Sequence, residues 1–293
     1  MKKNNTDKQY QIIIDKGKNY LESLIVDGLC TSFHQFRRGP SDAWTSACIG
    51  STLATIGKVR SDILFSLLKL QRDSGGWAYN HLASADADTT LRVLQFFNKI
   101  GFSDVAIINP AIEFIYQHQD VSGGICTFTL DELASMGRPE RIRYAMPHLD
   151  VSALALNVLP ESERKEKISE YVFSQIKNTF KSYWWRTNYY VAYEVGKMFN
   201  EKTDDSISTG LEFLLYAKLK QRVPECKITN FCKWQFPDGS FPSSYQLQLP
   251  RPLLQYSMSS EEEIELVEDN NKIFSTATAI VAISRQLEIS KRL

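Results

Sequence analysis

The sequence predicts an all-α protein folded as a single (α/α) barrel, and three observations support this fold. A short turn motif recurs after helix-like stretches, a second class of helix alternates with these stretches, and strand signals are sparse. The two helix classes alternate with a period of roughly 45 to 60 residues. Helix pairs of this kind can close into a ring, so we expect about six inner and five or six outer helices around a central apolar cavity. The cavity should open where the inner helices begin.

The turn motif consists of Gln, three residues, Gly, one residue and a large apolar residue. Each copy follows apolar residues at helical spacing. Glycine there is a typical helix stop, because it adopts the left-handed conformation without a Cβ clash. The three copies are Gln71–Trp77, Gln119–Ile125 and Gln235–Phe241. We therefore predict that each copy ends an outer helix.

The second helix class opens with polar or capping residues and continues into small and apolar ones. Small side chains let helix backbones approach closely, which suits a crowded interior. These helices begin near Asp42, Asp86, His148 and Phe274. We therefore assign them to the inner ring.

The connections and the domain organisation follow from the same pattern. Long loops are expected at 125–147, 221–230 and 241–272. No change in composition marks a domain boundary. We therefore expect one domain over residues 1–293, with the repeats between about 42 and 287.

Composition excludes several classes of protein. With 293 residues, 43% hydrophobic and 23% charged, the chain can bury a large core. Its 34 basic residues balance its 34 acidic ones, so no net charge attracts nucleic acid and no nucleic-acid partner is expected. Neither a signal peptide nor the roughly 20 apolar residues of a membrane span is found. We expect a cytoplasmic protein, with peripheral membrane contact left open.

The turns and the stretch Asp86–Thr90 together resemble the squalene–hopene cyclase and class II terpene cyclase superfamily. The likeness is greatest to its small stand-alone members with prenyltransferase/squalene oxidase repeats. It also includes Trp184–Thr187 and Phe274–Ala279. The resemblance implies a terpene cyclase that cyclises a linear isoprenoid by protonation inside the cavity.

The family's catalytic pattern is DxDD, in which the middle Asp is the general acid. Asp86 matches the first acid and Asp88 the middle one, whereas Thr89 replaces the third. The resemblance therefore implies that Asp88 protonates a double bond or an epoxide and that Asp86 modulates it. Larger members enclose their site between two barrels. Whether a partner supplies a second barrel here is left open.

The chemistry of such an acid sets conditions on its surroundings. Burial and a neighbouring carboxylate would keep Asp88 protonated, because two like charges so close cannot both ionise easily. The helix N-terminus instead favours the carboxylate. Either Asp could also be a helix N-cap. The sequence leaves open whether Asp88 is an acid or a cap.

A carbocation formed in the cavity needs aromatic faces to stabilise it. The candidate substrate contacts are Trp44, Trp77, Trp185, Tyr189 and His148. Trp44 and Trp185 are favoured because they stand at inner-helix starts, as Asp88 does. His148 opens an equivalent helix, where it could orient the acid.

Cofactors and head-group contacts are less defined. The histidines and cysteines show no metal-ligand spacing, so no metal or cofactor is expected, and Mg²⁺ only if the substrate is a diphosphate. The five cysteines should be buried free thiols. Arginines that could bind a diphosphate, or form ordinary surface ion pairs, are Arg37, Arg38, Arg138, Arg141 and Arg143.

An alternative function is a non-catalytic barrel that binds a lipid or a partner protein. The missing third acid and the missing second barrel favour it. An aromatic-lined cavity would favour an enzyme or a lipid binder, whereas a cavity filled by its own side chains would favour a partner-binding scaffold. The sequence does not determine the substrate's length or head group, the product or the oligomeric state.

Overall fold

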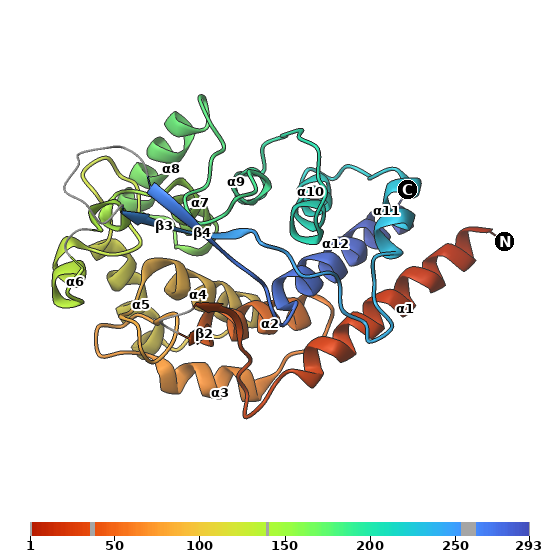
Figure 1. The fold of residues 1–293 in the computed structure, drawn as a ribbon, viewed down its shortest axis with the longest axis horizontal. Helices are drawn as coiled ribbons and strands as arrows, with labels where there is room; N and C mark the ends of the chain where they lie inside the picture. Colours follow the sequence, from red (N-terminus) through yellow and green to blue (C-terminus); the bar gives the residue numbers. More distant parts are fainter. Residues whose placement is uncertain (1, 36–38, 139–140, 253–261, 293) are drawn as a thin grey trace.

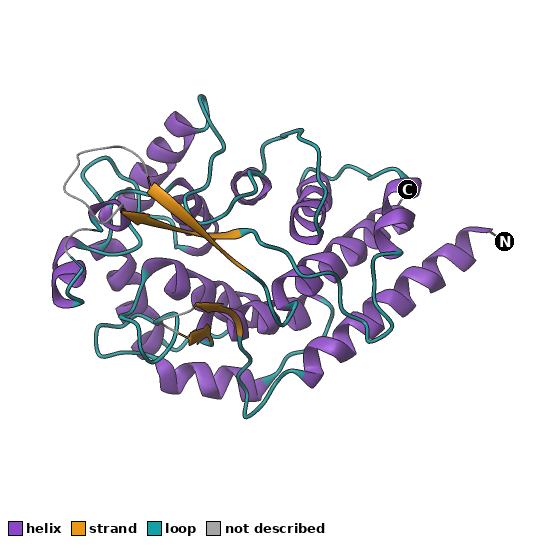
Figure 2. Cartoon of the chain, viewed as in Figure 1, coloured by secondary structure: helices purple, strands orange, loops and turns teal. Residues whose placement is uncertain are grey.

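The computed structural model describes residues 2–35, 39–138, 141–252 and 262–292 (Figure 1). Helices make up most of these residues, and strands occur in two separate two-stranded antiparallel sheets (Figure 2). The predicted all-α class is therefore confirmed.

Within the described residues, six helices form a closed inner ring. They are α2 (Ala43–Thr55), α4 (Ala87–Ile100), α7 (Leu149–Val158), α9 (Tyr189–Val195), α10 (Ser206–Lys218) and α12 (Ile273–Arg292). Each helix contacts the next in this order, and α12 contacts α2. The inner ring expected from the small-residue helices is confirmed by this closure.

The outer helices lie against this ring. They are α1 (Lys2–Ser23), α3 (Ser61–Leu70), α5 (Val105–Gln117), α8 (Glu163–Gln175) and α11 (Glu225–Cys232). The helix α1, which the sequence pattern did not predict, packs along α12. The two ends of the chain consequently lie on the same side of the molecule (Figure 1).

The recurring turn joins neighbouring outer helices through its glutamine side chain. Gln71 Nε2 donates to the carbonyl of Gly75 at 2.8 Å and to that of Ile107 in α5 at 3.0 Å. The same pair of contacts links Gln119 to Gly123 and Arg164, and Gln235 to Gly239 and Ile13. Each turn therefore ends one outer helix and fixes it to the next.

The glycine of each turn is required by its backbone conformation and by the neighbouring helix. Gly123 has a φ of +90°, and a Cβ there would lie 2.4 Å from the carbonyl oxygen of Lys167 in α8. Gly75 and Gly239 make equivalent close approaches to Pro110 and Lys16. Only glycine combines this φ with this contact.

A second repeated contact fixes how deep each inner helix sits. The backbone N–H of Trp77 donates to Thr90 Oγ1 at 2.9 Å, and Thr90 is the fourth residue of α4. Equivalent pairs are Cys30 with Ser46, Ile125 with Ser152, and Phe241 with Thr276. These contacts fix the depth of α2, α4, α7 and α12. The second residues of the six inner helices are Trp44, Asp88, Asp150, Tyr190, Ile207 and Phe274.

The prediction of a long loop at 241–272 is wrong in part. The strand β3 (Leu247–Pro252) pairs antiparallel with β4 (Glu262–Val267). Pro250 and Pro252 favoured a loop, but a two-stranded sheet has two free edges that tolerate proline. A second small sheet joins β1 (Ser32–Gln35) to β2 (Gly39–Ser41).

The other two expected loops also contain helices. The range 125–147 includes α6 (Leu130–Ser135) and the 3₁₀ helix η1 (Ile142–Ala145), and 221–230 includes most of α11. In α6 a capping box joins Thr129 to Glu132, a signal that the sequence carried. The expectation of one domain over 1–293 stays a prediction. The five cysteines are free thiols, but the expectation that they are buried is wrong for Cys226, which is exposed.

We predict that Gly123→Ala destabilises the protein more than Gly57→Ala. Both glycines have similar positive φ values, of +90° and +88°, but Gly57 has no atom within 4 Å of a built Cβ. Both variants therefore carry backbone strain, and only Gly123→Ala adds a clash with α8. The free energy of unfolding from urea titration should be lower by about 2 kcal/mol or more in Gly123→Ala. Equal losses in both variants would contradict the role given to the turn.

Candidate functional site

A cavity lies at the end of the ring where the inner helices begin. About 780 Å³ of space lies within it, a volume that includes solvent at its open mouth. Its lining includes Phe33, Trp44, Phe128, Tyr144, Trp184 and Trp185. Both small sheets contribute, through Phe33 and Gln35 of β1 and Leu247 and Leu249 of β3. The position and the aromatic lining agree with the predicted central cavity.

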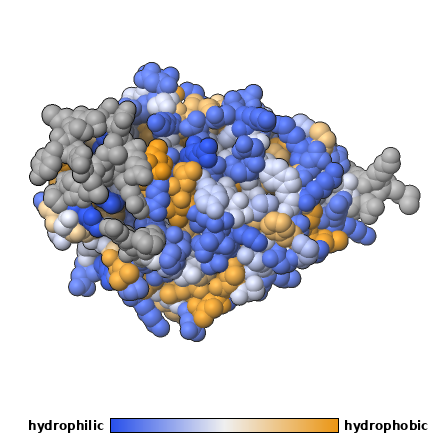
Figure 3. Space-filling view, viewed as in Figure 1, coloured by the Kyte–Doolittle hydropathy of each residue, from blue (hydrophilic) through white to orange (hydrophobic). Residues whose placement is uncertain are grey.

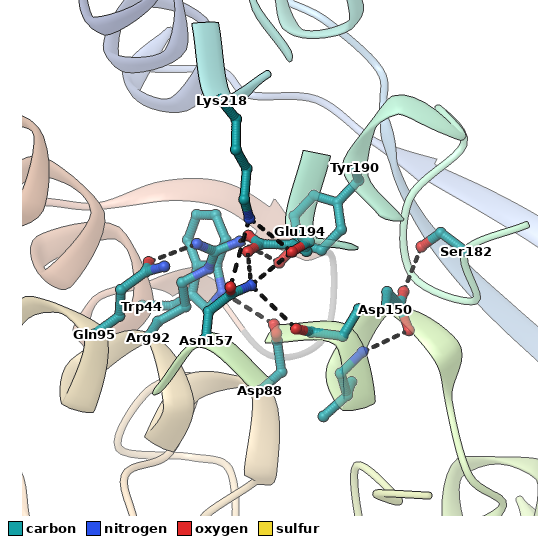
Figure 4. A network of polar contacts seen from close by, with 12 residues as sticks. Trp44, Asp88, Arg92, Gln95, Asp150, Asn157, Ser182, Tyr190, Glu194 and Lys218 are labelled. Atoms are coloured by element: carbon teal, nitrogen blue, oxygen red, sulfur yellow. Dashed lines mark hydrogen bonds and ion pairs between the residues drawn. The ribbon is translucent and has the colours of Figure 1, made fainter. Parts of the chain in front are cut away.

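Asp88 lies in the wall of this cavity. Trp44 Nε1 donates to Asp88 Oδ2 at 2.9 Å (Figure 4). Within the described residues Oδ1 has no hydrogen-bond partner, and the side chain retains some exposure toward the cavity. One carboxyl oxygen is therefore held, while the other is free to face a ligand.

The surroundings of Asp88 favour its protonated form. Burial raises the pKa of the carboxyl to about 7, with further increases from Asp86 and Asp150. The guanidinium of Arg92 and the indole N–H of Trp44 act in the opposite direction. Burial outweighs the helix N-terminus, which was the main argument against an acid at this position.

Asp86, rather than Asp88, is the N-cap of α4. Its Oδ1 accepts from the backbone N–H of Thr89 and its Oδ2 from Thr89 Oγ1, both at 2.8 Å. Burial raises the pKa of Asp86 to about 6, and the bonds from Thr89 lower it. The threonine in place of a third acid thus anchors Asp86. The sequence left open whether Asp88 is an acid or a cap, and the geometry excludes the cap, because Asp86 caps α4.

An aromatic cluster surrounds the acid. The Trp185 ring lies 5.6 Å from Trp44, 5.1 Å from Tyr190 and 4.9 Å from Phe274 between centroids. The Phe33 ring lies 5.9 Å from both tryptophans. Tyr190 and Phe274 were not among the predicted contacts, although they occupy the same helix position as Trp44 and Asp88. That shared position is the signal that would have found them.

Asp150 occupies the equivalent position on α7 but has a structural task. Its Oδ2 accepts from the Ser182 hydroxyl and from the backbone N–H groups of Tyr183 and Trp184, the latter two at 3.1 and 2.8 Å. Its carboxylate thereby holds the segment that carries the cavity residues Trp184 and Trp185. Both carboxyl oxygens of Asp150 are engaged, since Oδ1 accepts from the backbone N–H of Val151.

Arg141 supplies a positive charge in the cavity wall. Its guanidinium donates to the Tyr144 hydroxyl at 3.1 Å, and its buried Nε has no hydrogen-bond partner among the described residues. Arg138 and Arg143 do not line the cavity. Arg37 and Arg38 lie outside the described residues.

Three predicted substrate contacts do not line this cavity. Trp77 is fully buried, donates through Nε1 to the Leu67 carbonyl and packs on Phe97, because it belongs to the turn that joins helices. Tyr189 points away, and its hydroxyl donates to the Glu201 carbonyl.

His148 is also set back from the cavity. Its Nδ1 bonds Thr127 Oγ1 at 2.8 Å, its Nε2 bonds the Arg143 carbonyl, and its ring stacks on Tyr183. Thr127 lines the cavity and lies between the cavity and His148. Burial lowers the pKa of His148 to about 4, so the imidazole is neutral and structural at neutral pH. Among the described residues, no group of three or more His, Cys, Asp or Glu side chains could hold a metal ion.

The fold matches solved structures over nearly its whole length. The type II terpene cyclase MstE from Scytonema superposes with a TM-score of 0.80 at 21% identity, covering 98% of this chain and 100% of that chain. A variant of MstE in complex with its substrate geranylgeranyl dihydroxybenzoate has a TM-score of 0.81 at 20% identity, covering 97% and 99%. A protein from Actinoplanes has a TM-score of 0.78 at 19% identity, covering 94% and 99%. This chain has the type II terpene cyclase fold.

The type II terpene cyclase fold confirms the architecture that the sequence resemblance implied. No protein-family model matches the sequence, and no curated protein matches it. In the described ranges no helix is both long and apolar enough to cross a membrane.

We predict a pH-dependent stability difference between the wild type and Asp88→Asn. The pKa of Asp88 rises on folding from its ordinary 3.8 to about 7, so its contribution is fully present below pH 4 and is lost as pH rises through 7. Between pH 4 and 8 the variant should gain roughly 2–4 kcal/mol of unfolding free energy relative to the wild type. Denaturant titrations at several pH values measure this difference. Asp131→Asn, at an exposed acid of α6, is the control. A constant difference would show that Asp88 ionises normally.

Proposed function

We propose that the chain is a class II-type terpene cyclase in which Asp88 protonates a linear isoprenoid. The observation that carries the proposal is a buried carboxyl with one oxygen held by Trp44 and the other free toward an aromatic-lined cavity. Its pKa of about 7 keeps the proton available at neutral pH.

The proposed reaction starts with proton transfer from Asp88 to an alkene. The Asp88 O–H bond breaks and its electron pair stays on the carboxylate, while the alkene π pair forms the new C–H bond. The carbocation left on the adjacent carbon is attacked in turn by further double bonds of the same chain, which closes the rings. Loss of a proton from the last cation to water forms the product alkene, and water returns a proton to Asp88. The net change is an isomerisation.

The aromatic cluster supports this chemistry. Ring faces stabilise cations without acting as nucleophiles. Trp44, Trp185 and Phe33 all line the cavity that Asp88 faces. Proton-initiated cyclisation requires no metal ion, and Mg²⁺ enters the proposal only for a diphosphate substrate.

The substrate is proposed to be an isoprenoid with an anionic head group. MstE variants are solved with geranylgeranyl dihydroxybenzoate and with the product merosterolic acid A. The buried Nε of Arg141, which has no hydrogen-bond partner in the described part of the chain, is suited to bind a carboxylate or a phosphate oxygen. We propose that Arg141 holds the head group while the chain extends toward Asp88.

The proposal places the enzyme in the cytoplasm with peripheral membrane contact during substrate uptake. The face drawn in Figure 3 is mostly hydrophilic, with separate apolar patches. Ile264 and Leu266 of β4 are exposed, on the strand paired with the cavity strand β3. A lipid substrate could enter from a membrane along this side.

The non-catalytic alternative retains one specific support. The structure has one barrel, so the cavity is open at its mouth. A lipid binder needs the aromatic cavity but not a protonated acid. The first experiment below separates the two functions.

We predict that Asp88→Asn abolishes cyclisation. Asparagine keeps the shape and accepts the Trp44 hydrogen bond but cannot supply the proton. Mass spectrometry after incubation with farnesyl and geranylgeranyl diphosphates, their alcohols, squalene and a geranylgeranyl arene carboxylate should show cyclic product from the wild type and at least about 100-fold less from the variant. Asp131→Asn should resemble the wild type. Turnover by Asp88→Asn would exclude Asp88 as the acid, and lipid retained by both proteins without product would favour the binding function.

We predict that Arg141→Gln raises KM for substrates with an anionic head group by about tenfold or more, because a charge-assisted hydrogen bond is lost. The kcat should change little, since the acid is untouched. A neutral alcohol of the same chain length should show no change in KM. Arg143→Gln, at an exposed arginine of the same 3₁₀ helix, is the matched control. An equal effect on the acidic and the neutral substrates would contradict head-group binding.

A further inference from the structure

A buried arginine lies one helical turn beyond the acid. Arg92 follows Asp88 by four residues on α4, so the two side chains share one helix face. Its guanidinium lies 5.3 Å from the Trp44 ring centroid and 5.2 Å from that of Tyr190, and it donates to the Tyr190 hydroxyl. Trp44 thus contacts Asp88 through its N–H and Arg92 through its ring face (Figure 4).

A buried glutamate compensates this arginine. Glu194 Oε1 lies 3.6 Å from Arg92 Nη2, and only 3% of its side chain is exposed. Asn157 Nδ2 donates to Glu194 Oε2 at 2.9 Å, and Lys218 Nζ donates to the Glu194 carbonyl at 2.8 Å. In the described part of the chain, Arg92 forms its ion pair with Glu194 and not with Asp88.

The pair separates the acid from a second cavity. That cavity is lined by Arg92, Glu194, Gln95 and Cys48 among others, whereas Asp88 and Trp44 line the first cavity. Arg92 donates to Gln95 at 2.8 Å on this far side. The charges therefore lie behind the acid, where they do not contact the proposed substrate.

We propose that Arg92 and Glu194 are positioning residues that set how readily Asp88 releases its proton. Arg92 stabilises the carboxylate that proton transfer leaves, and Glu194 limits this effect by pairing with Arg92. The inference rests on the proposed function of Asp88 as the acid. It adds two residues, outside the DxDD pattern, that act through Asp88.

The other groups around Asp88 do not replace this pair. The titratable groups facing Asp88, besides Arg92, are the N-cap Asp86, Asp150 on α7 and Tyr190 on α9, and Cys48 on α2 faces Arg92. Burial raises the pKa of Cys48 to about 12 and that of Tyr190 well above its usual 10, so both are neutral. Asp86 and Asp150 raise the pKa of Asp88. Arg92 is therefore the one cation among these described neighbours that opposes burial.

The test compares Arg92→Gln and Glu194→Gln across pH. Activity requires protonated Asp88, so kcat falls as pH rises through the pKa of Asp88. In Arg92→Gln the pH at which kcat falls to half its maximum (the alkaline limb) should rise by about one pH unit, because Asp88 becomes a weaker acid. For the same reason, the maximal kcat at lower pH should fall about tenfold. In Glu194→Gln the limb should move down, since Arg92 is less compensated.

Three further measurements keep the outcome decisive. Arg92→Lys should restore the limb toward its wild-type position, because the charge returns. Glu212→Gln removes a different buried glutamate, one that pairs with Lys227, and should leave the alkaline limb of the pH profile unchanged. Infrared difference spectra against Asp88→Asn follow the Asp88 carboxyl directly and need no turnover.

The outcomes are distinguishable from failure of the proposed function. If the wild type makes no product but the Asp88 titration still shifts in opposite directions in the two variants, the cyclase proposal fails and the charge pair stands. If product forms but neither the limb nor the infrared titration moves, Arg92 and Glu194 are structural and the inference is overturned. Loss of activity with an unmoved limb leads to the same conclusion.

Discussion

The hydrogen bond from each turn to a hydroxyl on the following inner helix is the constraint on which this site depends. Thr90 Oγ1 accepts from Trp77 and also donates to the Asp86 carbonyl at 2.7 Å, so one side chain joins the turn, the cap and the helix. Because the contact recurs on α2, α4, α7 and α12, it fixes the depth of these four helices relative to one another. The second residues Trp44, Asp88 and Phe274 can then meet at one end of the ring.

The contact that sets the depth of these helices uses a backbone N–H and the hydroxyl of the fourth residue. The second residue of each helix is therefore free to vary in chemistry. One such position holds the free acid Asp88, another the aromatic Trp44, and a third the acid Asp150. Asp88 and Asp150 differ only in their partners: Asp150 accepts three hydrogen bonds from 182–184, whereas Asp88 accepts one from Trp44. Environment, rather than residue type, therefore separates the proposed proton donor from the structural carboxylate.

The sequence predicted the ring because its turns carry a local signal, and it predicted Trp44 because Trp44 has the helix position of Asp88. Trp185 lines the cavity as expected, but the helix start predicted for it is wrong, because α9 begins only at Tyr189. It failed at Trp77, since an aromatic residue in a turn does not reveal whether it faces the cavity or the neighbouring helix. It also missed the turn at Gly28, where a Cβ would lie 2.3 Å from the Asp62 carbonyl although no glutamine precedes it. At Gly28 the close approach to α3 is kept although the glutamine of the turn motif is missing, so the sequence motif could not reveal this turn.

Arg92 illustrates why an acid of this kind needs a balance of opposing effects. Burial keeps the proton on Asp88, but burial alone also makes the carboxylate costly to form, which slows proton transfer to an alkene. A cation in contact with the acid would remove the proton altogether. In the proposed arrangement, Arg92 lies one turn away, behind the Trp44 ring and paired with Glu194, so it would stabilise the carboxylate without discharging the acid. The helical spacing of Asp88 and Arg92 on α4 would then set the strength of this effect.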